Sequence, residues 1–394
     1  MKFINEVDLK GKRVFIRCDF NVPMDENGNI TDDTRIKAAL PTIQYAIDNK
    51  AKVILASHLG RPKGKKNEKY SLRAVAKRLS TLLSRDVVFI SDLDDENELK
   101  KLEGLDVGDV ALLENLRFYP GEEQNSEEFA AKLLKLFDIY VNDAFGVCHR
   151  KHASVYALAK LAKVAVAGFL LKKELEYFAK IFEIKEKPFV AVIGGAKISG
   201  KLDCLVNLLD KADKILIGGA QAFTFLKALG YETGKSLVED ELIDEALNIL
   251  NKAKTLNVKL YLPVDFLCSA SIDDTVNTCY CTYQEIKKDM MGLDIGPATV
   301  KLFEEALSDA KVVVWNGPMG VFEKKEFAHG TNKIAEAIGR LKALSVVGGG
   351  DTAEAVIRAN QAHNMSYIST GGGASLKLLE GKTLPAVEVL EEKE

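Results

Sequence analysis

Short apolar runs rich in β-branched residues recur along the chain, and each is followed by a segment with helical periodicity. In the first half these runs occupy residues 13–17, 52–56, 86–90, 109–113 and 138–141. In the second half they occupy residues 189–193, 214–217, 259–262, 311–315, 344–347 and 367–369. Near-continuous apolar strands that alternate with helices are typical of parallel sheets covered on both faces. The pattern therefore predicts an α/β protein with two doubly wound, Rossmann-like parallel-sheet domains.

A helix is predicted between the two halves, over residues 171–182. Its apolar positions fall on one face at helical spacing, namely Leu171, Leu175, Phe178 and Phe182. Pro188 prevents the helix from continuing into the next strand. We expect a first domain at 1–170, a connecting helix and hinge at 171–187, and a second domain at 188–377. A helix packed wholly within one domain is an equally good interpretation of this pattern.

Composition narrows the class of protein. Apolar residues make up 47% of the chain, charged residues 28%, and the formal net charge is -3. These values are ordinary for a globular protein and argue against a general nucleic-acid or membrane-surface binder. The chain has no apolar run long enough for a membrane span and no signal-peptide core at its start. Its cysteines are scattered, so we expect reduced thiols and a cytoplasmic location.

Polar and charged side chains gather where the strands of the first half are predicted to end, which is where open parallel sheets bind ligands. This set includes Asp19, Asn21, Arg35, His58, Arg61, Arg117, His149, Arg150 and His152. Arginine presents a planar fork of donors that matches carboxylate and phosphate groups. We therefore predict a cationic basin, built by arginine and histidine, for a small anion with several charges. Each residue taken alone is more often a solvated surface charge, and the interpretation depends on their shared placement.

The predicted strands of the second half end in glycine turns, at residues 194–196, 218–220, 316–318, 348–351 and 371–374. Glycine lets the backbone approach a phosphate closely, and the helix N-terminus behind it offers free N–H groups. A single turn of this kind is weak support, because strand–helix turns also use glycine for packing. Several turns in one predicted sheet favour a nucleotide site.

Residues 195–201 match the G-x-x-x-x-G-K phosphate-loop pattern, but Leu202 replaces the metal-binding hydroxyl residue that should follow. Lys197 and Lys201 lie four residues apart, and we place both on one face of the helix that follows. There, one lysine would reach the transferred group and the other the terminal phosphates. Two surface lysines are the alternative interpretation.

The magnesium ligand must then come from elsewhere in the chain, and Asp351 is the best candidate. We expect Asp351 to open a helix at its N-cap, where aspartate is also common without any further role. Glu323 is a candidate for a hydrogen bond to a ribose hydroxyl, and an exposed carboxylate without a function is nearly as good an interpretation.

Taken together and in order, these segments resemble the phosphoglycerate kinase family over nearly the whole chain. The matching segments are 17–23, 57–62, 114–118, 142–146 with 149–150, 194–197, 293–297, 315–318, 348–352 and 369–375. The resemblance implies a two-lobed enzyme that transfers a phosphoryl group from 1,3-bisphosphoglycerate to ADP, giving 3-phosphoglycerate and ATP with Mg²⁺. It also implies hinge-bending domain closure and in-line transfer. We expect a monomer, with neither nucleic acid nor membrane as a partner.

The resemblance also assigns roles to residues. The glycerate substrate would be held by Asp19, Asn21, Arg35, His58, Arg61, Arg117 and Arg150. The nucleotide would be held by Lys201, Gly218, Gly219, Gly292, Asn316, Glu323, Gly349, Gly350, Asp351 and Thr352, with Asp351 on Mg²⁺. The transferred group would be neutralised by Arg35, Lys197 and the amides of Gly371, Gly372 and Gly373. The C-terminal tail, about 378–394, would pack back on the first domain.

Two other functions stay open at this point. One is a non-catalytic sensor of a phosphorylated ligand on the same fold. The presence of Arg35, Lys197, Lys201 and Asp351 speaks against it, because a sensor does not need the groups that act on a transferred phosphoryl. The other is a dehydrogenase, although the dinucleotide-binding G-x-G-x-x-G pattern does not occur at the first strand of either half.

Overall fold

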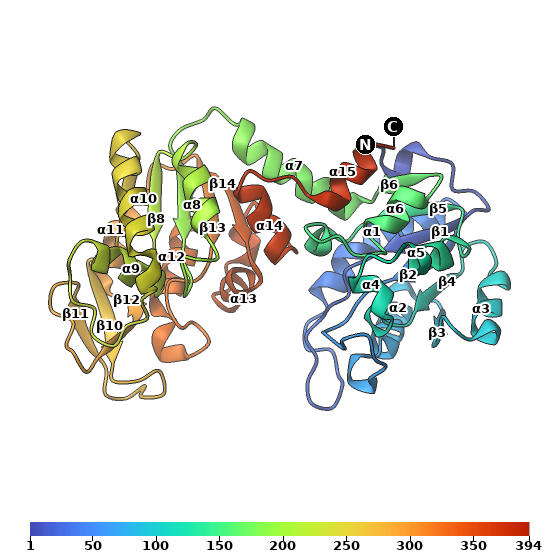
Figure 1. The fold of residues 1–394 in the computed structure, drawn as a ribbon, viewed down its shortest axis with the longest axis horizontal. Helices are drawn as coiled ribbons and strands as arrows, with labels where there is room; N and C mark the ends of the chain where they lie inside the picture. Colours follow the sequence, from blue (N-terminus) through green and yellow to red (C-terminus); the bar gives the residue numbers. More distant parts are fainter. Residues whose placement is uncertain (394) are drawn as a thin grey trace. The chain divides into compact units, whose positions relative to one another are not determined.

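The computed structural model describes residues 1–393, which form two compact units (Figure 1). Unit 1 comprises Met1–Glu176 and Thr383–Glu394, and unit 2 comprises Tyr177–Lys382. Each unit is built around a six-stranded parallel sheet. The predicted α/β class with two doubly wound parallel sheets is confirmed. Within residues 1–393, no helix combines the length and the apolar character needed to cross a membrane.

The sheet of unit 1 has the strand order β3-β4-β2-β1-β5-β6. Its strands are β1 (Arg13–Arg17), β2 (Lys52–Ala56), β3 (Val87–Ile90), β4 (Val110–Leu113), β5 (Ile139–Asn142) and β6 (Ala165–Ala167). Its helices are α1 (Thr34–Asp48), α2 (Arg73–Leu83), α3 (Glu96–Glu103), α4 (Pro120–Glu123), α5 (Glu127–Leu134), α6 (Ala157–Leu161) and α15 (Pro385–Glu391). Strand β6 was not predicted, because three small residues do not form a recognisable apolar run.

Both faces of this sheet are buried, which explains why its strands are apolar at successive positions. Val14 and Ile16 of β1 belong to a core shared with α1 and α2. The intervening Phe15 points to the other face, where its ring centroid lies 5.1 Å from that of Phe137 and 6.0 Å from that of Tyr140. Because side chains alternate along a strand, a sheet covered on both faces needs apolar residues throughout.

The large sheet of unit 2 has the order β15-β14-β13-β7-β8-β9. Its strands are β7 (Phe189–Ile193), β8 (Lys214–Ile217), β9 (Lys259–Tyr261), β13 (Val312–Asn316), β14 (Leu344–Gly348) and β15 (Tyr367–Ile368). Its helices are α8 (Leu202–Leu209), α9 (Gln221–Ala228), α10 (Ile243–Thr255), α11 (Pro297–Leu307), α12 (His329–Gly339), α13 (Gly350–Arg358) and α14 (Gly372–Leu379). The strands predicted for both large sheets agree with the observed ones to within one residue at each end.

Unit 2 also contains a small antiparallel sheet that the sequence pattern did not predict. It has the order β11-β10-β12, formed by β10 (Asp265–Ser269), β11 (Cys279–Thr282) and β12 (Met291–Ile295). In β11 only Cys281 is buried, and the pairing of β10 with β12 shifts register between Leu267 and Cys268. Strand β11 has exposed positions on either side of its one buried residue and therefore lacks the apolar run on which the prediction depended.

Helix α7 (Phe169–Glu183) contains the division between the units, which falls between Glu176 and Tyr177. Its buried side chains are Leu171, Glu174, Phe178 and Ile181. The predicted apolar face is therefore partly wrong, since Leu175 and Phe182 are only half-buried. Short 3-10 helices complete the elements, at η1 (Ile4–Glu6), η2 (Glu68–Tyr70), η3 (Leu116–Phe118), η4 (Phe145–Val147), η5 (Asp240–Leu242), η6 (Lys325–Phe327) and η7 (Ala362–Asn364).

The C-terminal helix α15 completes the core of unit 1, where it packs against α6 and β6 (Figure 1). The backbone N–H of Ala386 donates a hydrogen bond to the carbonyl of Cys148, with 3.2 Å between nitrogen and oxygen. Val389 and Leu390 are buried in this contact. The last residues of the chain therefore contribute apolar packing to the unit that contains its first residues.

We predict that Leu390→Ala lowers the free energy of unfolding of unit 1 by about 2–5 kcal/mol, because it removes a fully buried side chain. Trp315 is the only tryptophan and lies in unit 2. In denaturant, the far-UV circular dichroism transition should move to lower concentration while the tryptophan fluorescence transition moves less. The exposed neighbour Glu391→Ala serves as the control. Equal shifts of both signals would show that α15 stabilises both units alike.

Candidate active site

Each large sheet has a point at which the connections from neighbouring strands leave in opposite directions. In unit 1 this point lies between β1 and β5, and in unit 2 it lies between β7 and β13. Doubly wound sheets bind their ligands in the crevice beyond the strand ends at such a point. The residues that follow these strands are therefore the candidates for the site.

In unit 1, Arg35 in the first turn of α1 holds the loop after β1, and Asn21 joins that loop to the loop after β2. Arg35 Nη1 donates to both carboxylate oxygens of buried Asp19, at 3.2 and 3.3 Å, and to the carbonyl of Asn21 at 3.1 Å. The Asn21 side-chain oxygen accepts a hydrogen bond from the Gly60 N–H at 2.8 Å. The Arg35 side chain keeps 30% of its surface exposed, so it remains accessible to a ligand.

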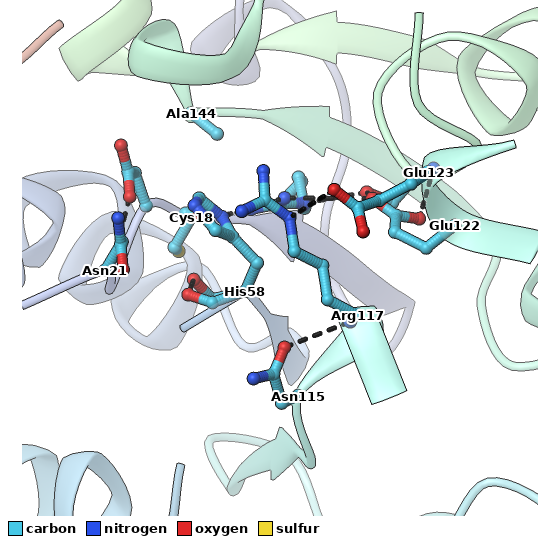
Figure 2. A network of polar contacts seen from close by, with 12 residues as sticks. Cys18, Asn21, His58, Asn115, Arg117, Glu122, Glu123 and Ala144 are labelled. Atoms are coloured by element: carbon cyan, nitrogen blue, oxygen red, sulfur yellow. Dashed lines mark hydrogen bonds and ion pairs between the residues drawn. The ribbon is translucent and has the colours of Figure 1, made fainter. Parts of the chain in front are cut away.

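Arg117 is held in the same place by η3, but its charge is incompletely paired. Its backbone N–H donates to the Asn115 side chain at 3.0 Å (Figure 2). Its Nη1 donates to the Gly60 carbonyl at 2.9 Å. Its Nε lies 3.7 Å from a Glu123 carboxylate oxygen and has no hydrogen-bond partner among residues 1–393. Burial and the charge of Arg17 lower the pKa of Arg117 to about 10. An anion beside this guanidinium would accept a hydrogen bond from Nε and would raise the pKa of Arg117 again.

The remaining predicted arginines lie in the neighbouring loops. Arg61 is exposed, directly after Gly60. Arg150 follows η4, and its Nε donates to Nε2 of His149 at 3.2 Å. The positive charge of Arg150 contributes to the lowered pKa of Arg117. Hydrogen bonds thus connect Asp19, Asn21 and Arg35 directly. Arg61 is related to them only because it follows Gly60 in the loop after β2.

His58 and His152 are neutral groups of this cluster, so the prediction that they add positive charge is wrong. Burial, followed by the charges of Arg17 and Arg117, holds the pKa of His58 well below its ordinary value. Burial, followed by the charges of Arg117 and Arg17, lowers the pKa of His152 to about 3. Surrounding arginines and the loss of water both oppose protonation of an imidazole.

A buried network behind these residues was not predicted from the sequence. Arg17 ends β1 and is fully buried, and its Nε donates to the Ser154 hydroxyl at 2.7 Å. The Ser154 hydroxyl donates to Glu122 Oε1 at 2.5 Å, and Arg17 Nη2 lies 3.9 Å from the same oxygen. Burial raises the pKa of Glu122, against the effect of Arg17. The available signal was an arginine that ends an otherwise apolar strand.

In unit 2, glycines allow the loops after β7, β8 and β13 to pack backbone against backbone. Gly219 and Gly317 have φ of +70° and +100°. A Cβ on Gly219 would lie 2.4 Å from the Gly195 carbonyl oxygen, and one on Gly317 would lie 2.2 Å from the Gly194 carbonyl oxygen. No other residue fits these positions without displacing a loop.

Lys201 lies at the switch point of this sheet. Its ammonium donates to the carbonyls of Gly194, at 2.6 Å, and Asn316, at 3.0 Å, which follow and end the two central strands. Burial lowers its pKa to about 8, although the negative charge of Asp351 acts in the opposite direction. Lys201 is therefore held by the backbone carbonyls of the two central strands of the sheet.

The predicted placement of Lys197 and Lys201 on one helix face is wrong, because α8 begins only at Leu202. Residues 195–201 form a loop in which Lys197 is exposed and Lys201 is half-buried. The backbone N–H groups of Ile198 and Ser199 donate to one carboxylate oxygen of buried Glu239, at 2.6 and 3.2 Å. Because these two amides donate to Glu239, they do not donate within a helix. This explains why the loop extends to Lys201 and α8 begins later than predicted.

The N-termini of α13 and α14 lie next to each other. The N-cap of α13 is Gly349, with φ of +98°, so the prediction of an Asp351 N-cap is wrong, and Asp351 lies exposed in the first turn. Gly371 is the N-cap of α14. A Cβ on Gly372 would lie 3.7 Å from the Gly350 nitrogen. Two helix N-termini at this separation offer amide groups to one anion.

The other residues predicted to bind the nucleotide differ in how they are connected to these helices. Thr352 accepts a hydrogen bond from the Gly317 N–H at 2.7 Å, which joins α13 to the loop after β13. Gly218 lies against Met319, and Gly292 of β12 lies against Phe223 of α9. Gly373 and Glu323 are exposed. The contacts thus join Gly194, Asn316, Gly317, Thr352 and Lys201, whereas no such contact joins Glu323 to them in the described part of the chain.

The residues present fit a magnesium–nucleotide complex. Among residues 1–393, no group of three His, Cys, Asp or Glu side chains is arranged to hold a metal ion by itself. Magnesium in phosphoryl-transfer sites needs only one or two protein carboxylates, because phosphates and waters supply the other ligands. The exposed carboxylate of Asp351, beside amides that suit phosphates, meets this requirement.

Comparisons with known proteins agree over almost the whole chain. The sequence model of the family described as "Phosphoglycerate kinase" matches residues 4–382. The chain is 57% identical over 394 residues to "Phosphoglycerate kinase" of a Nitratiruptor species, and the match covers 99% of this chain and 98% of the relative. It is 55% identical over 393 residues to that of Geotalea uraniireducens, covering 100% and 98%.

Solved structures give the same result. The phosphoglycerate kinase of Coxiella burnetii superposes with a TM-score of 0.88 at 44% identity, covering 99% of this chain and 98% of that one. The enzyme of Pyrococcus horikoshii OT3 gives a TM-score of 0.85 at 34% identity, covering 100% and 99%. On sequence and on structure alike, the chain belongs to the phosphoglycerate kinase family.

Proposed function

We propose that the polar cluster of unit 1 binds the glycerate substrate and that the glycine turns of unit 2 bind the nucleotide. The reaction follows from family membership. The chain is a phosphotransferase with a carboxyl group as acceptor, which moves a phosphoryl group reversibly between 1,3-bisphosphoglycerate and ADP. The products are 3-phosphoglycerate and ATP, with Mg²⁺ as cofactor, and the reaction belongs to glycolysis.

The observation that best supports the substrate assignment is the buried, incompletely paired guanidinium of Arg117. A substrate that carries both a carboxylate and a phosphate would supply the missing negative charge. We assign the glycerate ligand to Asp19, Asn21, Arg35, His58, Arg61, Arg117 and Arg150. Here arginine charges attract the anion, while Asp19 and Asn21 hold Arg35 and the Gly60 loop in place.

We assign the nucleotide to Lys201, Gly218, Gly219, Gly292, Asn316, Glu323, Gly349, Gly350, Asp351 and Thr352. The adjacent N-termini of α13 and α14 would receive its phosphates, and Lys201 would add a positive charge. Asp351 would hold the metal. Bound Mg²⁺ supplies positive charge that offsets the negative charge of the phosphates.

The transfer step needs no general base, because the acceptor carboxylate is already ionised at neutral pH. What remains is to position the reactants and neutralise charge on the moving phosphoryl group. We assign this neutralisation to Arg35, Lys197 and the amides of Gly371, Gly372 and Gly373. Because the two ligands bind to separate units, transfer requires closure of the units around the hinge that includes α7.

We further propose that the enzyme acts as a cytoplasmic monomer without nucleic-acid or membrane partners. Each proposed half-site is built within a single unit of one chain, and the net charge of -3 gives no general attraction to polyanions. Sedimentation velocity measures the mass directly, and a dimer at assay concentrations would contradict this proposal.

The first test separates catalysis from nucleotide binding. We predict that Arg35→Ala lowers kcat on the order of 10²–10³-fold, since it removes a charge aimed at the transferred group, and leaves the Kd for ADP unchanged. Steady-state kinetics and calorimetry measure the two quantities. The control is Lys37→Ala, on the same helix, whose side chain is 56% exposed and pairs with Asp33. A kcat equal to that of the control would remove Arg35 from the site.

The second test concerns the metal ligand. We predict that Asp351→Asn raises the Mg²⁺ concentration needed for half-maximal activity by about tenfold or more, because a neutral amide binds Mg²⁺ poorly. Glu354→Gln is the matched control on the same helix, where Glu354 pairs with Arg358 at the surface. An unchanged magnesium titration in Asp351→Asn would assign the metal to another residue.

The third test uses the lowered pKa of Lys201, about 8. Phosphates favour the protonated amine, so the affinity for ADP should fall as pH rises above 8, approaching about tenfold per pH unit. Calorimetry at successive pH values measures this dependence. Lys201→Met should bind weakly at every pH, whereas the surface variant Lys211→Met should keep the dependence of the original chain. A pH-independent affinity in the original chain would contradict a phosphate contact.

A further inference from the structure

The buried guanidinium of Arg17 contacts the imidazole of His58. Arg17 Nη2 lies 3.3 Å from His58 Nδ1. The rest of the guanidinium is fixed, because Nε donates to Ser154 and Nη1 donates to the Cys18 carbonyl. His58 itself is only 3% exposed. Arg17 therefore cannot turn away from His58 without breaking buried hydrogen bonds.

This contact determines which ring nitrogen carries the proton. A guanidinium has N–H donors and no lone pair that can accept a hydrogen bond. His58 Nδ1 must therefore accept from Arg17, and in a neutral imidazole the other nitrogen, Nε2, then carries the hydrogen. The side of the imidazole that faces away from Arg17 therefore carries an N–H donor.

The surroundings also keep the ring neutral. The charged or titratable groups that act on His58 are Arg17 of β1, Arg117 of η3, Arg35 of α1 and His152. Glu122 of α4 lies next to Arg17, 3.9 Å from its Nη2. Positive groups surround the ring, and a second proton on it would be opposed by all of them.

We propose that Arg17 is a positioning residue that fixes His58 in the Nε2–H tautomer, so that His58 presents a neutral hydrogen-bond donor to the anionic substrate. This inference rests on the proposed substrate role of His58. Glu122 and Ser154 take part by holding Arg17, and Figure 2 shows Glu122, His58 and Arg117 within one polar network. The donor would then stay available across the pH range in which an ordinary histidine changes its charge.

The tautomer can be measured directly in the ligand-free chain. Long-range ¹H–¹⁵N correlation spectra identify the protonated nitrogen of each histidine, and His58→Gln assigns the signal. We expect a single Nε2–H form between about pH 5 and 8. An Nδ1–H form, a mixture of the two, or titration of the ring in this range would overturn the inference.

The double variant Arg17→Met with Glu122→Gln removes the donor without leaving a buried, unpaired carboxylate. We expect His58 to become a mixture of tautomers and the Kd for 3-phosphoglycerate to rise by about tenfold. Adding His58→Ala to this variant should then cost less affinity than His58→Ala costs in the original chain, because the two positions act together.

The matched control is Arg13→Met with Asp138→Asn. Arg13 lies on the same strand as Arg17 and forms an exposed ion pair with Asp138 at 2.9 Å. This control should change neither the tautomer nor the affinity. If the buried double variant does not fold, the spectra of the original chain still decide the question.

The outcomes separate this inference from the function on which it rests. A mixture of tautomers in the original chain, together with weakened 3-phosphoglycerate binding by His58→Ala, overturns the role of Arg17 alone. If His58→Ala binds 3-phosphoglycerate as tightly as the original chain, the substrate role of His58 is wrong, and the purpose assigned to Arg17 is wrong with it. The Nε2–H form combined with weakened binding supports both.

Discussion

The structure of the site depends on how a cation withdrawn from water, fully in unit 1 and partly in unit 2, is stabilised at the switch point of each sheet. Taking a charged side chain out of water costs several kcal/mol unless it is paired or hydrogen-bonded. In unit 1 the cation is Arg17, stabilised by Glu122, Ser154 and a backbone carbonyl. In unit 2 it is Lys201, stabilised by the carbonyls of Gly194 and Asn316. The loops that form the two half-sites are arranged around these groups.

The two units present opposite ways to attract an anion. Unit 1 uses side chains, and burial together with the charges of Arg17 and Arg150 lowers the pKa of the Arg117 guanidinium. Unit 2 uses the backbone, through helix N-termini that glycine allows to lie close together. Side-chain charges suit a small ligand whose carboxylate and phosphate must be held at defined positions. Backbone amides suit a phosphate chain, which approaches closely and carries its own metal ion.

The local structure could be predicted from the sequence wherever a single physical rule governs it. Strands buried on both faces must be apolar, so every strand of the two large sheets except the three-residue β6 was predicted to within a residue at each end. The antiparallel sheet was missed because strands such as β11 have few buried positions. The Lys197–Lys201 segment was assigned to a helix because its spacing fits one. The competing interaction, Glu239 binding the amides of Ile198 and Ser199, comes from a residue about 40 positions away. Local patterns cannot show such a contact.

The neutrality of His58 follows from the same density of positive charge on which the proposed anion site of unit 1 depends. A further cation beside Arg17, Arg35 and Arg117 would be repelled by each of them, and burial would add to the cost. An amide or hydroxyl could also donate a neutral hydrogen bond, but its orientation would depend on its own partners. An imidazole facing a guanidinium has one nitrogen that must accept, so the other must donate. Arg17, which contacts the ring, thus determines which nitrogen of His58 donates the hydrogen bond.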